Sequence, residues 1–213
     1  MDRRTHWRNP LVSATIFLEG AAFGPGSKDQ KIRCRKSFHN LLLQCGFEDH
    51  MPRLKVCGPR DSAFDDFKTA HAHKSKGDYV AMWIDSEDPL KDLNAAWHHL
   101  KVRDNWTRPS SAQNDQVLFM TTCMETWITA DRDAIKKHYG ARLQSSALPP
   151  LINLETRDRH DVQANLIHAT RNCANAYKKG DRSFDILGKL NPAALDQLPS
   201  FARTRRILNE KLK

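Results

Sequence analysis

The sequence predicts an α/β protein in which a doubly wound, mainly parallel sheet is followed by a C-terminal helical lobe. Strand-like and helix-like segments alternate over about the first 120 residues, and this order implies right-handed crossovers. Residues 79–84 form a near-continuous apolar run, which is typical of a strand buried on both faces of a parallel sheet. The segments that follow the fourth expected strand have the pattern of helices joined by short loops.

The chain before residue 46 predicts one strand and one helix. Residues 11–18 are rich in β-branched and aromatic side chains and stop at Glu19, which predicts a strand and then a turn. Residues 21–29 contain three Gly or Pro positions and predict a loop. The apolar spacing of residues 31–45 predicts an amphipathic helix that ends at Gly46.

The next segments continue the alternation. Residues 53–57 predict a second strand, and we expect Asp61 or Ser62 to cap the helix that follows it. The apolar run at residues 79–84 is the third strand, and it stops abruptly at Asp85.

The rest of the chain predicts one more strand and several helices. We expect a helix over residues 90–102, a strand over residues 116–122 and a helix over residues 124–139 that contains Trp127 as a core residue. Residues 1–140 would then form the α/β core and residues 141–213 a helical extension packed on it. In that extension we expect helices over residues 162–176, 183–190 and 192–213.

The composition excludes several classes of protein. Hydrophobic residues make up 39% of the chain, too many for a disordered protein, and no apolar run approaches the roughly 20 residues that span a bilayer. The five cysteines are scattered, which argues against a disulfide framework or a structural zinc site and predicts small buried thiols. The N-terminus has no secretory pattern, so we expect a cytoplasmic protein with no membrane partner.

The charge favours a polyanionic partner. The chain has 34 Lys and Arg residues against 25 Asp and Glu residues, a net charge of +9. Basic residues release counterions from phosphates, so nucleic acid is the partner that this charge suggests. Residues 20–28 do not have the spacing of a nucleotide-binding P-loop, because the lysine is misplaced and Pro25 removes an amide.

Acidic residues follow two of the expected strands. Glu19 comes after the first strand, and Asp85, Glu87 and Asp88 come after the third. Ligands of open α/β sheets bind outside the carboxyl ends of the strands, where these acids would meet. Clustered carboxylates repel one another and are stable mainly around a cation, and oxygen ligands select Mg²⁺ or Mn²⁺. Alternatively, Glu19 caps a helix and Asp85 belongs to an ordinary turn.

These two acidic motifs resemble the signatures of Toprim domains, which have a glutamate after the first strand and an Asp-x-Asp motif after the third. Further segments resemble an uncharacterised bacterial Toprim-like family, related to RloB and to the nuclease half of OLD proteins and often encoded beside an ABC-type ATPase in phage-defence loci. These segments are residues 35–38, 58–60, 123–127 and 177–180. The resemblance implies a Toprim-like fold, a magnesium-dependent nuclease, and both nucleic acid and an ABC-type ATPase as partners, with a homodimer left open.

The resemblance also implies roles for individual residues. Glu19 would be the general base or a metal ligand, Asp85 and Glu87 would be metal ligands, and Asp88 would be a further ligand. Glu125 follows the fourth strand and is a candidate extra acid, or alternatively a solvated residue of the first helical turn. Four basic residues near helix starts or loop ends are candidates to contact nucleic-acid phosphates, or alternatively are solvated surface residues: Arg35, Arg60, Lys178 and Lys179.

Two departures from the family pattern keep a second hypothesis open. Many relatives have another acid shortly after the first glutamate, where this chain has Phe23, and the second acid of the Asp-x-Asp motif is the longer Glu87. A catalytically degraded subunit that binds an ATPase or nucleic acid is therefore the alternative to the nuclease. A basic α/β protein without phosphate chemistry is the third reading.

Overall fold

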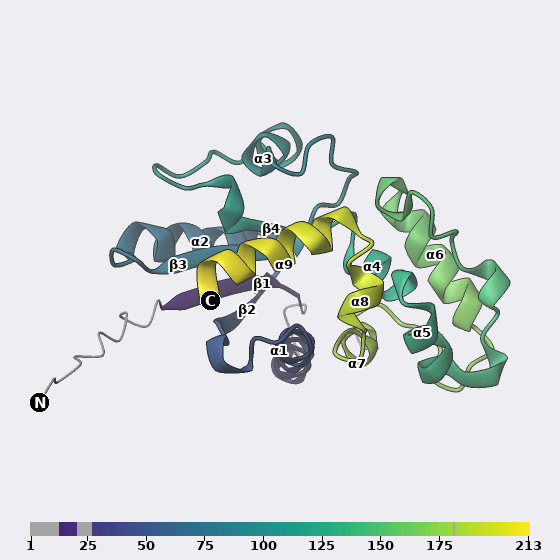
Figure 1. Cartoon of the computed structure of the whole chain (residues 1–213). Helices are drawn as coiled ribbons and strands as arrows, with labels where there is room; N and C mark the ends of the chain where they lie inside the picture. Colours follow the sequence, from purple (N-terminus) through teal and green to yellow (C-terminus); the bar gives the residue numbers. More distant parts are fainter. Residues whose placement is uncertain (1–12, 21–26, 181) are drawn as a thin grey trace, which may run out of the picture.

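The computed structural model describes residues 13–20, 27–180 and 182–213, and it confirms an α/β fold (Figure 1). All strands of the sheet are parallel, and their order is β2-β1-β3-β4. The strands are β1 (Ala14–Glu19), β2 (Arg53–Gly58), β3 (Tyr79–Asp85) and β4 (Val117–Met120). Phe23 lies outside the described residues.

Nine α-helices are described, of which three connect consecutive strands. They are α1 (Ser27–Gln44), α2 (Arg60–His73), α3 (Ala96–Asp104), α4 (Met124–Ala130), α5 (Arg132–Tyr139), α6 (Arg159–Thr170), α7 (Ser183–Leu187), α8 (Pro192–Leu195) and α9 (Pro199–Leu212). The helices expected at residues 162–176 and 183–190 are shorter than predicted. The single helix expected over residues 192–213 is divided into α8 and α9.

The strand order creates a topological switch point between β1 and β3. The chain leaves β1 for β2 on one side, then returns past β1 to β3 and continues to β4 on the other side. The connections therefore diverge at the carboxyl ends of β1 and β3, where open α/β sheets form a crevice for ligands.

Alternating side chains of the strands point to two apolar cores, one on each face of the sheet. Ile16 and Trp83 belong to the core that includes α1, α4, α7 and α9, whereas Phe17 and Met82 belong to the core that includes α2 and α3. This alternation is expected from the two-residue period of a strand. The chain thus forms three layers, with the sheet in the middle (Figure 1).

Helix α9 completes one of the outer layers. Only α1 among the crossover helices lies on that face, so the β3 and β4 half needs another cover. Helix α9 lies along it (Figure 1), and Phe201 packs edge-to-face on Trp127 with ring centroids 5.0 Å apart. Phe201 and Leu208 of α9 share one core with Ile16 of β1. The C-terminal helices are thus part of the main core.

Four predicted helix starts were wrong. Helices α1 and α6 begin at Ser27 and Arg159, earlier than the expected residues 31 and 162, and the starts of α2 and α3 also differ. Helix α2 begins at Arg60 after Pro59 and has no side-chain cap, so neither Asp61 nor Ser62 caps it. The helix expected from residue 90 begins at Ala96, because Asn114 Oδ1 accepts a hydrogen bond from the Trp97 N–H at 3.0 Å. That partner is distant in sequence and leaves no local signal.

The helix expected over residues 124–139 is divided at Asp131. Its Oδ1 accepts from the Ala134 N–H at 2.9 Å and so caps the start of α5. Its Oδ2 accepts from the Asn191 N–H at 2.7 Å, which anchors the chain before α8. Trp127, on the first half, is fully buried, as predicted for a core residue.

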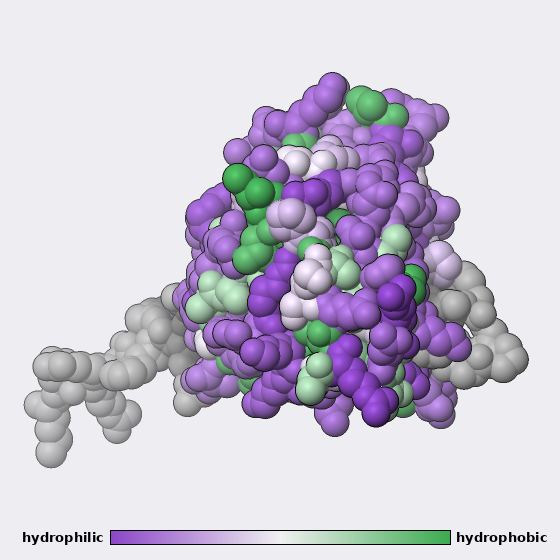
Figure 2. Space-filling view, turned by 90° about the vertical axis from the view of Figure 1, so that its right-hand side faces the viewer, coloured by the Kyte–Doolittle hydropathy of each residue, from purple (hydrophilic) through white to green (hydrophobic). Residues whose placement is uncertain are grey.

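The surface and the cysteines agree with the expectations from composition. Figure 2 shows that the face over α5 and α6 is mostly hydrophilic, with apolar residues in small separate groups. Within the described ranges, no helix has the length and apolar character needed to cross a membrane. All five cysteines are buried free thiols.

Candidate active site at the carboxyl edge of the sheet

The structure brings together three of the acids that the sequence places at this edge. Glu19 is the last residue of β1, Asp85 is the last residue of β3, and Glu87 follows two residues later. Each offers a carboxylate oxygen, and these three oxygens lie within 4.8 Å of one another. The Asp85 N–H also donates to Glu19 Oε2 at 3.1 Å, so the ends of the two strands are directly linked.

The turn after β3 fixes the position of Glu87. The Ser86 N–H donates to the Met120 carbonyl at 3.0 Å, and the Glu87 N–H donates to the Thr122 carbonyl at 2.7 Å. Glu87 has a φ of 70°, a left-handed conformation that is uncommon for a residue with a side chain. The backbone pairing with the end of β4 thus holds Glu87 in a conformation that brings its carboxylate beside Asp85.

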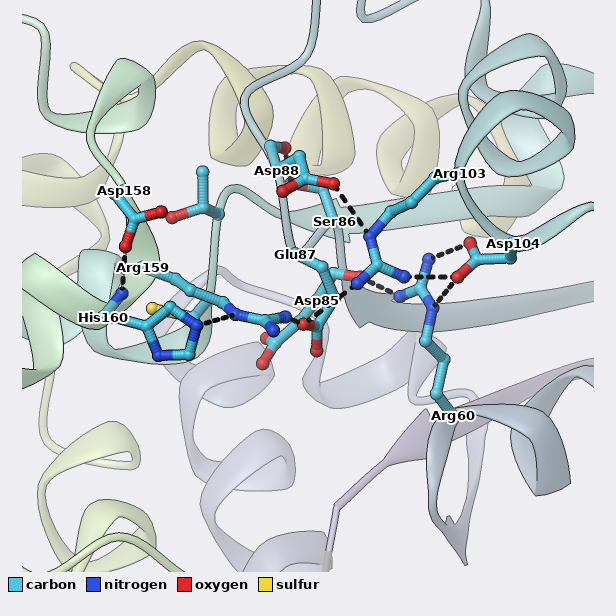
Figure 3. Close-up of polar contacts among 12 residues, drawn as sticks. Arg60, Asp85, Ser86, Glu87, Asp88, Arg103, Asp104, Asp158, Arg159 and His160 are labelled. Carbon is cyan, nitrogen blue, oxygen red and sulfur yellow. Dashed lines mark hydrogen bonds and ion pairs between the residues drawn. The ribbon is translucent and has the colours of Figure 1, made fainter.

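Asp88 does not join this group. Its side chain is 62% exposed, and its Oδ2 accepts a hydrogen bond from Arg103 Nε at 3.0 Å (Figure 3). Because Asp88 comes after the left-handed residue, its carboxylate lies on the outer side of the turn. The structure therefore does not support the expectation that Asp88 is a ligand alongside the other three acids.

A pocket of about 400 Å³ opens over the three acids. Its wall includes Glu125 from the first turn of α4 and Lys179 from the segment before α7. Glu125 is only 1% exposed, which excludes the reading of a solvated acid. Its carboxylate accepts hydrogen bonds from the Tyr177 hydroxyl and from Gln163 Nε2, the second at 3.2 Å.

The acids of this pocket lie in an unfavourable environment for their charges. Burial raises the pKa of Asp85 well above its ordinary value, and the charges of Glu19 and Glu125 raise that pKa further. Burial also raises the pKa of Glu19, although the Arg60 charge lowers it in part. Among the described residues, Asp85 Oδ1 is buried and has no hydrogen-bond partner. These oxygens fit a hard divalent cation, which would neutralise the cluster and satisfy the orphaned oxygen.

Arg60, the first residue of α2, contacts both Asp85 and Glu19. Its Nη1 donates to the Asp85 carbonyl and lies 3.7 Å from Glu19 Oε2. Its Nε and Nη2 bind Asp104 at 3.2 and 2.8 Å, and the guanidinium lies 5.0 Å from the Trp106 ring centroid. Arg60 is at the site, as expected, but its N–H groups bind oxygens of the protein. It therefore holds the ends of β1 and β3, which carry Glu19 and Asp85, in place.

The other predicted basic residues are divided between the site and the surface. Lys179 lines the pocket, and its charge lowers the pKa of both Glu19 and Asp85. Lys178 is exposed and is not part of the pocket wall. Arg35 is exposed on α1 and lines a different, shallower groove with Pro52 and Leu54. Cys34 and Phe38 of this helix are buried in the core. Arg35 lies on the solvent side of the helix and therefore faces away from the site.

Two arginines at the site were missed by sequence reasoning. Arg103, at the end of α3, lies with its Nη2 3.3 Å from Glu87 Oε2 and also pairs with Asp88 and Asp104. Arg159, at the start of α6, contacts the same Glu87 oxygen from the opposite side (Figure 3). Neither belongs to a motif, and in a chain with 34 basic residues no local signal distinguishes them.

Tyr177→Phe tests how strongly the buried acid Glu125 depends on its hydroxyl partner. Removing a donor from a buried charged group should lower the free energy of unfolding by about 1.5–3 kcal/mol. Tyr79→Phe is the matched control, because the Tyr79 hydroxyl donates to the neutral Asp115 carbonyl. That variant should lose only about 0.5–1.5 kcal/mol. Urea denaturation measures both losses, and equal losses would contradict the expected difference between the two acceptors.

The fold and the site define a parallel α/β protein with a carboxylate pocket at the switch point of its sheet. The chain belongs to the family described as a domain of unknown function, DUF4276, whose model matches residues 27–208. The matched region contains Asp85, Glu87, Glu125 and Arg159, and it begins after Glu19. No curated protein and no solved structure matches the chain.

Proposed function

We propose that this protein is a nuclease that uses Mg²⁺ or Mn²⁺ to hydrolyse phosphodiester bonds of DNA or RNA. One observation carries the proposal: carboxylate oxygens of Glu19, Asp85 and Glu87 lie within 4.8 Å of one another at the wall of an open pocket. The first of these acids is 66 residues from the second in the sequence. Holding three carboxylates this close together costs electrostatic energy, because they repel one another. Phosphoryl transfer with a divalent cation is the chemistry that best explains such a cluster.

The residues of the pocket have separate tasks in this proposal. Glu19, Asp85 and Glu87 would hold the cation, which would supply charge to polarise a phosphate oxygen and to stabilise the leaving oxygen. Glu19 would also be placed to accept a proton from the attacking water, because its carboxylate lines the pocket. Lys179, at the pocket wall, attracts the phosphate, and Arg60 keeps the ends of β1 and β3 in register.

We also propose that the nuclease acts in the cytoplasm as the effector of an antiviral defence pair with an ABC-type ATPase. This part rests on the resemblance of residues 123–127 and 177–180 to Toprim-like proteins encoded beside such ATPases. Glu125 and Lys179, which belong to these two segments, line the same pocket. Where a neighbouring gene encodes such an ATPase, co-expression of the two proteins should yield a stable complex on gel filtration, and separate elution would contradict the pairing.

One observation favours the degraded-subunit alternative. The Glu87 carboxylate already contacts Arg103 and Arg159, so protein cations neutralise it without a metal. In that case the protein would bind nucleic acid or the ATPase but would take up no divalent cation.

Calorimetric titration with Mn²⁺ distinguishes the two functions. The wild-type protein should bind Mn²⁺, and Glu19→Gln should weaken this binding by at least about tenfold, because one charged ligand is lost. The same variant should reduce cleavage of plasmid DNA or RNA by roughly 10²- to 10⁴-fold, since it also removes the proposed general base. A wild-type protein that binds no Mn²⁺ and cleaves neither substrate contradicts the nuclease.

A further inference from the structure

Two arginines contact the carboxylate of Glu87, and they differ in how they are held. Arg103 Nη2 lies 3.3 Å from Glu87 Oε2, while its Nε and Nη1 pair with Asp88 and Asp104. Its guanidinium therefore bridges three carboxylates, two of which keep it in place if Glu87 is withdrawn.

Arg159 has fewer contacts. Across the part of the chain that the structure describes, Glu87 is the one carboxylate with which it forms an ion pair. Its other polar contact joins Nε to His160 Nε2 at 3.4 Å. The side chain begins at the first residue of α6, a helix start that Asp158 caps through the His160 N–H at 2.7 Å. A rigid helix thus presents a guanidinium that depends on a single acid (Figure 3).

The carboxylate of Glu87 cannot bind Arg159 and a divalent cation equally well at the same time. Both would compete for the same carboxylate, and two cations a few ångströms apart repel each other. Arg103, which has Asp88 and Asp104 as further partners, can stay when Glu87 changes ligand. Arg159 is the group that must move.

We propose that Arg159 is an exchangeable residue, which leaves Glu87 when that carboxylate binds a divalent cation and then binds a backbone phosphate of the nucleic-acid substrate. This inference rests on the proposed nuclease function. A guanidinium presents planar N–H donors that match two phosphate oxygens, so the released side chain suits a phosphodiester. It would also offset the repulsion between the phosphate and the carboxylates of the pocket.

The exchange predicts opposite effects on two ligands. Arg159→Ala removes the competitor of the cation, so this variant should bind Mn²⁺ more tightly than the wild type by about tenfold. The same variant should bind a short fluorescent single-stranded oligonucleotide about tenfold more weakly in Ca²⁺, because one phosphate contact is lost. Arg159→Lys keeps the charge but lacks the planar guanidinium. Its affinities for Mn²⁺ and for the oligonucleotide should therefore lie between those of the wild type and those of Arg159→Ala.

Arg171→Ala is the matched control, because Arg171 is an exposed arginine at the other end of the same helix. It removes the same charge and should leave Mn²⁺ affinity unchanged. Calorimetry measures the metal, fluorescence anisotropy measures the oligonucleotide, and circular dichroism checks that each variant is folded.

Each result decides between distinct claims. If the wild type binds no Mn²⁺, the proposed function and the exchange both fail. If the wild type binds Mn²⁺ and Arg159→Ala binds it no more tightly, the exchange is overturned while the nuclease stands. If Arg159→Ala binds Mn²⁺ more tightly and the oligonucleotide unchanged, the phosphate role is overturned.

Discussion

Asp85→Asn is expected to abolish the proposed cleavage of nucleic acid while raising the thermal midpoint of the metal-free protein by several degrees. The loss should be at least about 10³-fold, since a bound cation contributes several kcal/mol to the transition state. The gain in stability has a separate cause. Burial and the charges of Glu19 and Glu125 raise the pKa of Asp85, so its ionised form destabilises the folded state at neutral pH. An amide keeps the shape and removes that charge.

The stability effect should depend on pH in a definite direction. A carboxyl with a folded pKa above its unfolded pKa stabilises the fold when protonated, and this contribution is lost as the pH rises through the folded pKa. The difference in thermal midpoint between Asp85→Asn and the wild type should therefore grow from acid to neutral pH. Asp65→Asn is the control, because Asp65 is an exposed acid of α2 that pairs with Lys68. A variant that is less stable than the wild type at neutral pH would contradict the argument.

Trp127→Ala is expected to lower the free energy of unfolding by about 3–5 kcal/mol, the cost of deleting a large buried aromatic side chain. Trp127 is fully buried, and its ring lies edge-to-face with Trp83 of β3 at 5.7 Å and with Phe201 of α9 at 5.0 Å. A cavity at this point would separate the sheet, α4 and α9 from one another. Urea denaturation measures the loss.

Two further variants make this result specific. Trp127→Phe should cost less, roughly 1–3 kcal/mol, because most of the packing is retained. The indole Nε1 has no hydrogen-bond partner among the described residues, so Phe forfeits no such bond. Ile152→Ala removes a side chain that is 73% exposed and should change stability by less than about 0.5 kcal/mol. A loss at Trp127 as small as that at Ile152 would show that the two layers do not meet there.

The sequence predicts the features that depend on local pattern. The four strands lie where their apolar patterns indicate, and Glu19 and Asp85 meet because parallel strands end at one edge of the sheet. Helix boundaries that depend on residues distant in the sequence are not marked by any local pattern. The start of α3 depends on Asn114, and the break at Asp131 depends partly on Asn191.

The same distinction applies within the site. Asp88 is next to Glu87 in sequence, yet the left-handed turn at Glu87 separates their carboxylates. Arg159 is 72 residues from Glu87 and reaches it only through the packing of α6 beside α4. Sequence reasoning identified the acids by their strands and also named Arg60 and Lys179, but it did not identify the arginines that contact Glu87, which are Arg103 and Arg159.

The cover that α9 gives to β3 and β4 has a consequence for synthesis of the protein on the ribosome. Trp83, two residues before Asp85, shares its core with Phe201 and Leu208, which are translated more than a hundred residues later. This face of β3 already contacts Phe38 of α1 and Trp127 of α4, and its cover is completed only after α9 has left the exit tunnel. A nascent chain without α9 would therefore leave part of this apolar face exposed to solvent.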